Sequence, residues 1–79
     1  MMNEKQIYRR MNECFESDYK MYDDEAEWYR GDDPKEWKFY IPSEDIDVRL
    51  TLDEANKRVL MEESKSKGEF RYAGYYYWG

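Results

Sequence analysis

Apolar side chains recur on one face at the 3.6-residue period of an α-helix through the first third of the chain. They are Ile7, Met11, Phe15, Tyr22, Ala26 and Tyr29. Asn3 and Gln6 have the spacing of a capping box, so the helix is expected to begin at Glu4. It either continues to Tyr29 or breaks near residues 17–18, where Ser and Asp favour caps and turns. A glycine and a proline follow soon after Tyr29 and prevent a longer helix.

Period-two alternation replaces the helical period in the second half of the chain. The aromatic run Trp37–Ile41 predicts a strand, and residues 42–45 predict a turn after it. Ile46–Leu52 alternates apolar and polar residues, which predicts a strand with one buried and one solvated face. Glu69–Trp78 is expected to form a last strand, with a bulge at Gly74.

The segment between these strands has two interpretations. Thr51–Glu54 has the form of a capping box, which favours a helix over Asp53–Ser64. Alternatively, residues 53–57 form a turn and residues 58–62 a strand. The first interpretation gives the order α-β-β-α-β in a single domain over residues 1–79. The predicted fold class is therefore α+β, a three-stranded antiparallel sheet with two helices on one face.

Aliphatic residues are scarce, and this raises the question of whether the chain folds at all. Leu, Ile, Val and Phe together occupy eleven of the 79 positions, below the roughly 20% expected of a globular domain. Nine Tyr, three Trp and three Phe compensate, because each ring can bury on the order of 150–250 Å². A folded domain with an aromatic core is expected.

Several classes of function are excluded by what the chain lacks. It has no His, so His-ligated zinc sites and His-dependent triads are impossible. Cys14 is the only cysteine, and its place on the apolar stripe favours a buried small hydrophobe over a reactive thiol. No apolar run approaches the roughly 20 residues of a membrane span, and no apolar signal-peptide core is seen. We expect a cytoplasmic protein that is not an enzyme and has no cofactor or metal.

Acidic residues concentrate in the middle of the chain. Residues 13–54 contain fifteen acids and five bases, a net charge of −10, whereas the remainder has a net charge of +4. Charge runs ordinarily mark a solvated surface. However, acids at residues 23–27 would lie at the C-terminal end of the predicted helix, where the helix dipole makes negative charge unfavourable. A placement that costs stability favours a role for the negative electrostatic field of these acids in binding a partner. The residues expected to contact a partner are Glu13, Glu16, Asp18, Asp23, Asp24, Glu25, Glu27, Asp32, Asp33, Glu36, Glu44, Asp45 and Asp47, with Trp28 and Tyr29 as aromatic anchors.

In length, acidic middle segment and interleaved aromatics, the chain resembles small phage-encoded inhibitors that mimic DNA. These include proteins that block host nucleoid-associated proteins, and some anti-CRISPR proteins. The resemblance implies a carboxylate-rich face that imitates a row of phosphates and binds the basic surface of a nucleic-acid-binding protein. It also implies a place in the host-cell cytoplasm and no direct binding of nucleic acid.

The aromatic C-terminal strand supports an alternative function. An aromatic sheet edge is prone to aggregation if it is left uncovered, and this strand contains Phe70, Tyr72 and the aromatic residues 75–78. This favours docking on a protein or forming a homodimer, without DNA mimicry. A third hypothesis, stacking of single-stranded bases on an outer sheet face, is opposed by the overall negative charge. Its residues would be Tyr40, Arg49, Arg71, Tyr75 and Tyr77.

Overall fold

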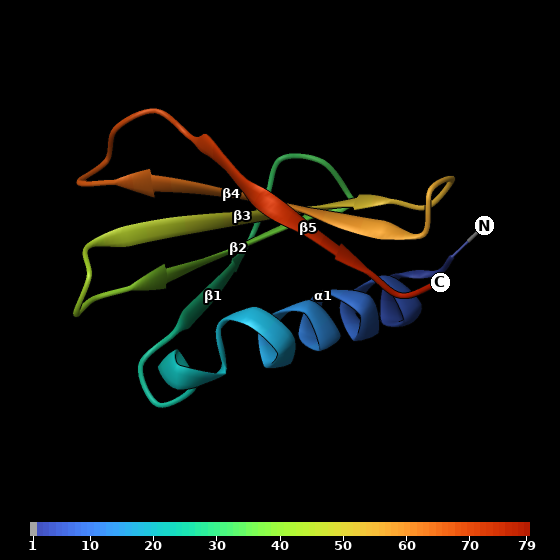
Figure 1. The fold of residues 1–79 in the computed structure, drawn as a ribbon, viewed down its shortest axis with the longest axis horizontal. Helices are drawn as coiled ribbons and strands as arrows, with labels where there is room; N and C mark the ends of the chain where they lie inside the picture. The colour runs from blue at the N-terminus through green and yellow to red at the C-terminus, as the bar shows by residue number, and fades with distance from the viewer. Residues whose placement is uncertain (1) are drawn as a thin grey trace.

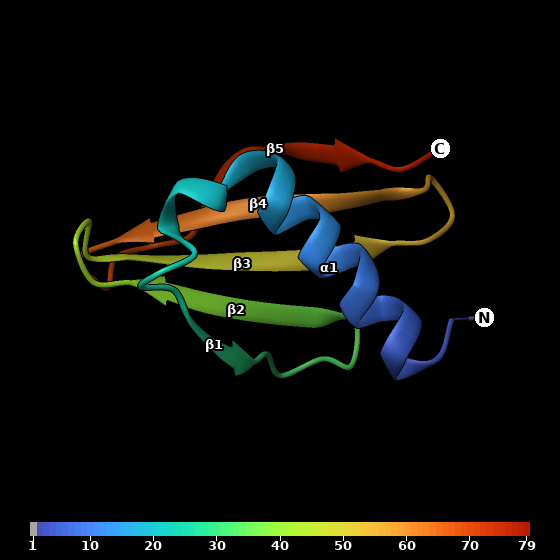
Figure 2. The same cartoon turned by 90° about the horizontal axis from the view of Figure 1, so that it is seen from below.

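One helix lies across one face of a five-stranded antiparallel sheet (Figure 1). The computed structural model describes residues 2–79. The helix α1 spans Glu4–Asp18, and a short 3₁₀ turn, η1, spans Lys20–Tyr22. The strands are β1 (Glu27–Arg30), β2 (Glu36–Ile41), β3 (Ile46–Asp53), β4 (Arg58–Lys65) and β5 (Arg71–Tyr77). They neighbour one another in chain order, so the sheet is a meander with β1 and β5 at its edges (Figure 2).

The predicted fold class is wrong, because residues 2–79 form five strands and one α-helix instead of three strands and two helices. The segment predicted as a second helix is the β3–β4 turn followed by β4, which was the alternative interpretation. Val59 and Met61 are buried toward α1, whereas Leu60 between them faces the other side of the sheet. Thr51 lies in β3 and caps no helix, and the turn is held instead by Asn56 and Arg58, which both donate to the carboxylate of Asp53.

The first helix ends at Asp18, so the predicted break near residues 17–18 is correct and the continuous helix to Tyr29 is wrong. Trp28 and Tyr29 belong to β1, a strand that the helical period concealed. The capping box is confirmed, with the side chain of Asn3 accepting from the backbone of Gln6 at 2.9 Å. The acids at residues 23–25 therefore lie in a loop, where they bear no cost from the helix dipole.

The remaining strands agree with the sequence patterns. β2, β3 and β5 form where alternation predicted them, and a bulge is present at Gly74 as expected. The register shifts between Met61 and Glu62, and Gly74 adopts a φ of +144°, a conformation that side-chain-bearing residues rarely reach.

The core is the layer between α1 and the sheet. Met11 and Cys14 on the helix are fully buried, as are Phe39, Val48 and Leu50 on the sheet. Rings supply much of the contact, as expected from the composition: Phe15 meets Phe39 edge-on at a centroid distance of 5.1 Å. Burial, followed by the nearby Asp18 charge, raises the pKa of the Cys14 thiol to about 12, so Cys14 is a packing residue as predicted.

Candidate functional site

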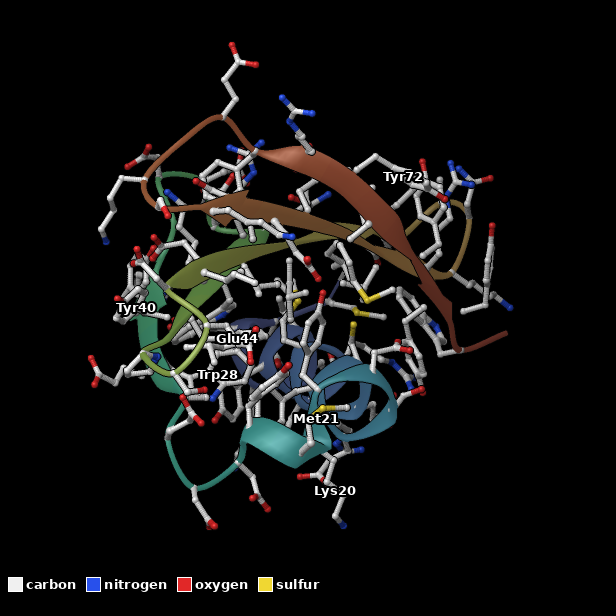
Figure 3. The ribbon with its side chains drawn as sticks, turned by 60° about the vertical axis from the view of Figure 1, so that its left-hand side comes forward. Lys20, Met21, Trp28, Tyr40, Glu44 and Tyr72 are labelled. Atoms are coloured by element: carbon white, nitrogen blue, oxygen red, sulfur yellow. The ribbon has the colours of Figure 1, made fainter. Side chains whose placement is uncertain are left out.

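Six of the acids predicted to bind a partner gather at one end of the molecule, in the loop before β1, at the first residue of β1 and in the turn between β2 and β3. We call this group the acidic end; it comprises Asp23, Asp24, Glu25, Glu27, Glu44 and Asp45. The carboxylate of Glu25 joins the two segments, because it accepts hydrogen bonds from the backbone N–H and the hydroxyl of Ser43, both at 2.8 Å. Figure 3 shows this end, with Glu44 on the turn and Lys20 and Met21 on η1.

The other predicted acids are placed elsewhere. A meander puts successive turns at opposite ends of a sheet, so Asp32, Asp33 and Glu36 lie at the end away from Glu44. The molecule is 35 Å long, which separates the two groups. Glu13 and Glu16 lie on α1 and form ion pairs with Arg10 and Lys20, and Asp18 ends that helix. The structure therefore brings together one acidic end, and it does not assemble all the acids on one face.

Asp47, another predicted contact, is committed to the fold. Asp47 is only 7% exposed. Its carboxylate accepts hydrogen bonds from the Tyr29 hydroxyl at 2.8 Å and from Lys67 Nζ at 3.2 Å. Burial, followed by the hydrogen bond to Asp47, raises the pKa of Tyr29 to about 12. Trp28 is likewise turned inward, with its ring 4.9 Å from that of Phe39.

Within residues 2–79, no helix covers the sheet face opposite α1 (Figure 1). We call it the open face. The strand register places on it Tyr29, Lys38, Tyr40, Arg49, Leu60, Glu62, Tyr72, Tyr75 and Tyr77. Tyr72 and Tyr77 are 67% and 57% exposed, and Tyr75 lies between them with ring centroids 5.6 and 6.0 Å away. The open face thus presents a row of three tyrosine rings along β5.

Cations are interleaved with these rings. The Arg49 guanidinium lies 4.2 Å from the Phe70 ring and donates to Glu62 at 2.9 Å, and that hydrogen bond raises the pKa of Arg49. Arg58 lies 4.0 Å from the ring of Tyr75 and donates to Asp53 at 2.7 Å. The loop before β5 folds back over the sheet to bring Phe70 onto this face, a placement that strand periodicity cannot indicate.

Four of the five residues proposed for base stacking do share the open face, but Arg71 does not. Arg71 pairs in register with Glu63, whose carboxylate accepts from Tyr19 on the helix side of the sheet. On the open face, Arg49, Arg58 and Lys67 are each already held by a carboxylate. These ion pairs reduce the positive charge that is available to a phosphate backbone.

A hollow of about 610 Å³ lies beneath the β4–β5 loop. Its charged lining consists of Glu63, Lys65, Glu69 and Arg71, two acids and two bases. Within residues 2–79, no three carboxylates or thiols are grouped so that they could hold a metal ion. No helix of this part of the chain is long and apolar enough to cross a membrane.

Comparisons with protein-family models, curated proteins and solved structures found no match to this chain. The acidic end and the open face are therefore the features of the molecule that bear on its function.

Proposed function

We propose that this protein is a non-enzymatic protein-binding module that docks through its open face. The observation that carries the proposal is the row of Tyr72, Tyr75 and Tyr77, with Tyr72 and Tyr77 more than half exposed on a sheet face without a covering helix. Tyrosine and arginine are the residue types that dominate interface energies, and this face interleaves both.

The geometry of the open face also limits the cost of binding. Arg49 and Arg58 are held between a carboxylate and a ring before any partner arrives. Ordering a free arginine side chain at an interface costs on the order of 0.5–1.5 kcal/mol, so prior ordering reduces this penalty. Leu60 adds an apolar side chain next to Tyr75 in the register.

The test is capture of binding proteins from a bacterial lysate by the wild type and two matched variants. The open-face variant Tyr72→Ala/Leu60→Thr removes apolar surface from the proposed site. The control, Met21→Ala, removes an apolar side chain that is 77% exposed on η1, away from the open face. We expect the open-face variant to lose a partner that the control retains; equal capture by both would refute the proposal.

The acidic end supports a second candidate function, inhibition of a basic nucleic-acid-binding protein by DNA mimicry. Its six carboxylates lie in two segments that Glu25 and Ser43 fasten together, which gives a local negative field rather than scattered charges. Such a field attracts the cationic groove of a DNA-binding protein and speeds its association.

Matched charge removal separates this second function from the first. Asp23→Asn/Asp24→Asn/Glu44→Gln neutralises three charges at the acidic end, and Asp32→Asn/Asp33→Asn/Glu54→Gln neutralises three at the opposite end. DNA mimicry predicts that only the first variant loses the partner, that DNA competes, and that affinity falls steeply between about 50 and 300 mM salt. Binding that is insensitive to salt and equal for both variants would leave open-face docking as the explanation.

A further inference from the structure

The two edges of the sheet differ in how they are protected against pairing with another strand. The edge strand β1 is four residues long and has a charged residue at each end, Glu27 and Arg30. Short edges and edge charges are the usual devices against strand addition. β5 is seven residues long, and the chain has no charged residue from Tyr72 to Gly79. The bulge at Gly74 interrupts this edge, but no edge charge protects the residues that follow it.

The hydrogen-bonding direction of β5 can be followed from its last residue. The N–H of Trp78 donates to the carbonyl of Lys57 at 3.0 Å, so the backbone of Trp78 points toward β4. Backbone groups alternate in direction along a strand, and therefore those of Tyr76 also point toward β4. The N–H and C=O groups of Tyr75 and Tyr77 consequently point away from the sheet. They lie on the free side of β5, which is an edge strand of the sheet (Figure 2).

We propose that β5 pairs antiparallel with β5 of a second copy of this chain, about a two-fold axis at Tyr76. In this register Tyr75 of each copy lies opposite Tyr77 of the other, and these are the residues with outward-pointing backbone groups. Each of the two symmetric pairs exchanges two backbone hydrogen bonds. The two sheets become one continuous sheet, and both open faces lie on the same side of it.

Side chains support a second copy as the occupant. The register sets Tyr75 against Tyr77 twice on the open face, and aromatic cross-strand pairs stabilise antiparallel pairing. Gly74 falls opposite Trp78 of the second copy, where a side chain on Gly74 would crowd the ring. Residues 75–78 all follow the bulge at Gly74, so side-chain direction alternates without a break through them.

Charge also permits the approach of two copies that each carry a net charge of −6. The edge itself is uncharged, and on the helix side its nearest flank holds Arg10, which lies 5.0 Å from the Trp78 ring. The charge of Arg10 is balanced by its ion pair with Glu13 at 3.0 Å. An edge of five residues buries less than the roughly 800 Å² per partner of a standard interface, so the dimer dissociates in the micromolar range or above.

Sedimentation and amide exchange of the wild type test the dimer without any substitution. The sedimenting mass should double between about 10 μM and 1 mM. The amides of Tyr75 and Tyr77 should become protected over the same range, while that of Tyr76, bonded to β4, stays protected throughout. The proposal would be overturned by a monomeric mass at all concentrations, or by amide exchange rates at Tyr75 and Tyr77 that do not change with protein concentration.

Charged variants test the register. Tyr75→Lys/Tyr77→Lys and Tyr75→Glu/Tyr77→Glu each place like charges opposite one another across the two-fold axis, so each alone should be monomeric. An equimolar mixture should form the heterodimer. Circular dichroism establishes that both variants are folded; a mixture that stays monomeric, or a variant that dimerises alone, contradicts the register. This outcome is independent of open-face docking, whose test changes Tyr72 and Leu60 instead.

Discussion

The hydroxyl of Tyr19 donates a 2.6 Å hydrogen bond to the carboxylate of Glu63, and this contact ties the end of α1 to β4 across 44 residues of sequence. Burial, then the hydrogen bond to Glu63, raises the pKa of Tyr19 well above its usual range. The contact sits where the chain leaves the helix, beside rings of Phe15 and Phe39. It therefore fixes the direction in which the chain turns toward β1.

Tyr19→Phe should destabilise the fold by about 1–3 kcal/mol, because the partly buried carboxylate of Glu63 loses its donor while the ring packing is kept. For a domain of this size, each kcal/mol lowers the melting temperature by about 4–8 °C. Thermal unfolding measures the effect. Tyr8→Phe is the control, since the Tyr8 ring packs against Trp28 and Trp37 without a side-chain hydrogen bond in the structure; equal losses for both substitutions would contradict the role assigned to Glu63.

Alkaline unfolding should depend on Tyr29. Its folded pKa is raised to about 12 by burial and by the hydrogen bond to Asp47, from an unfolded value near 10. A raised folded pKa gives stability that is fully present below pH 10 and is lost as pH rises toward 12. Tyr29→Phe should abolish this part of the pH dependence, measured as denaturation midpoints between about pH 9 and 12. An unchanged slope would mean that Tyr29 ionises normally in the folded state.

Acid sensitivity should involve Asp53. Hydrogen bonds from Asn56 and Arg58 lower its pKa, so the stability it contributes is present above the unfolded value near 4 and is lost as pH falls below it. Asp53→Asn should therefore flatten the decline in melting temperature below about pH 4. Glu54→Gln, one residue away in the same turn, provides the control and should leave that decline as in the wild type.

The Cys14 thiol should react slowly with a disulfide reagent in the folded protein. The residue is fully buried and its pKa is raised to about 12, so both access and thiolate are reduced at neutral pH. Modification should become fast in denaturant, and the ratio of the two rates reports the opening of the helix–sheet layer. Rapid labelling without denaturant would show that α1 separates readily from the sheet.

Gly74→Ala should destabilise the protein by about 1 kcal/mol or more, because φ is +144° at this position and alanine tolerates that conformation poorly. Space is not the main obstacle, since an added Cβ would lie 3.4 Å from the nearest atom, in the Met61 side chain. Ala73→Ser, at the exposed neighbour, is the matched control with an expected change near zero. Denaturant titration distinguishes them.

Local patterns in the sequence determined several elements without help from the fold. The capping box at Asn3 and Gln6 satisfies helix-end donors within four residues, so its outcome needs no distant partner. Alternation over residues 46–52 likewise dictated β3, because one face had to be buried. The bulge at Gly74 could be predicted for a similar reason, since only glycine reaches its φ easily.

Tertiary structure decided what local patterns left open. Residues 53–64 suit a helix or a turn and strand, and the choice was made by pairing with β3 on one side and β5 on the other. Trp28 and Tyr29 fit a helical period, yet β2 offered them a partner strand. The acids were close in sequence, but the meander sent their turns to opposite ends and buried Asp47. Strand pairing is non-local, so composition and periodicity indicate which residues are buried or charged, while only the register decides which of them meet.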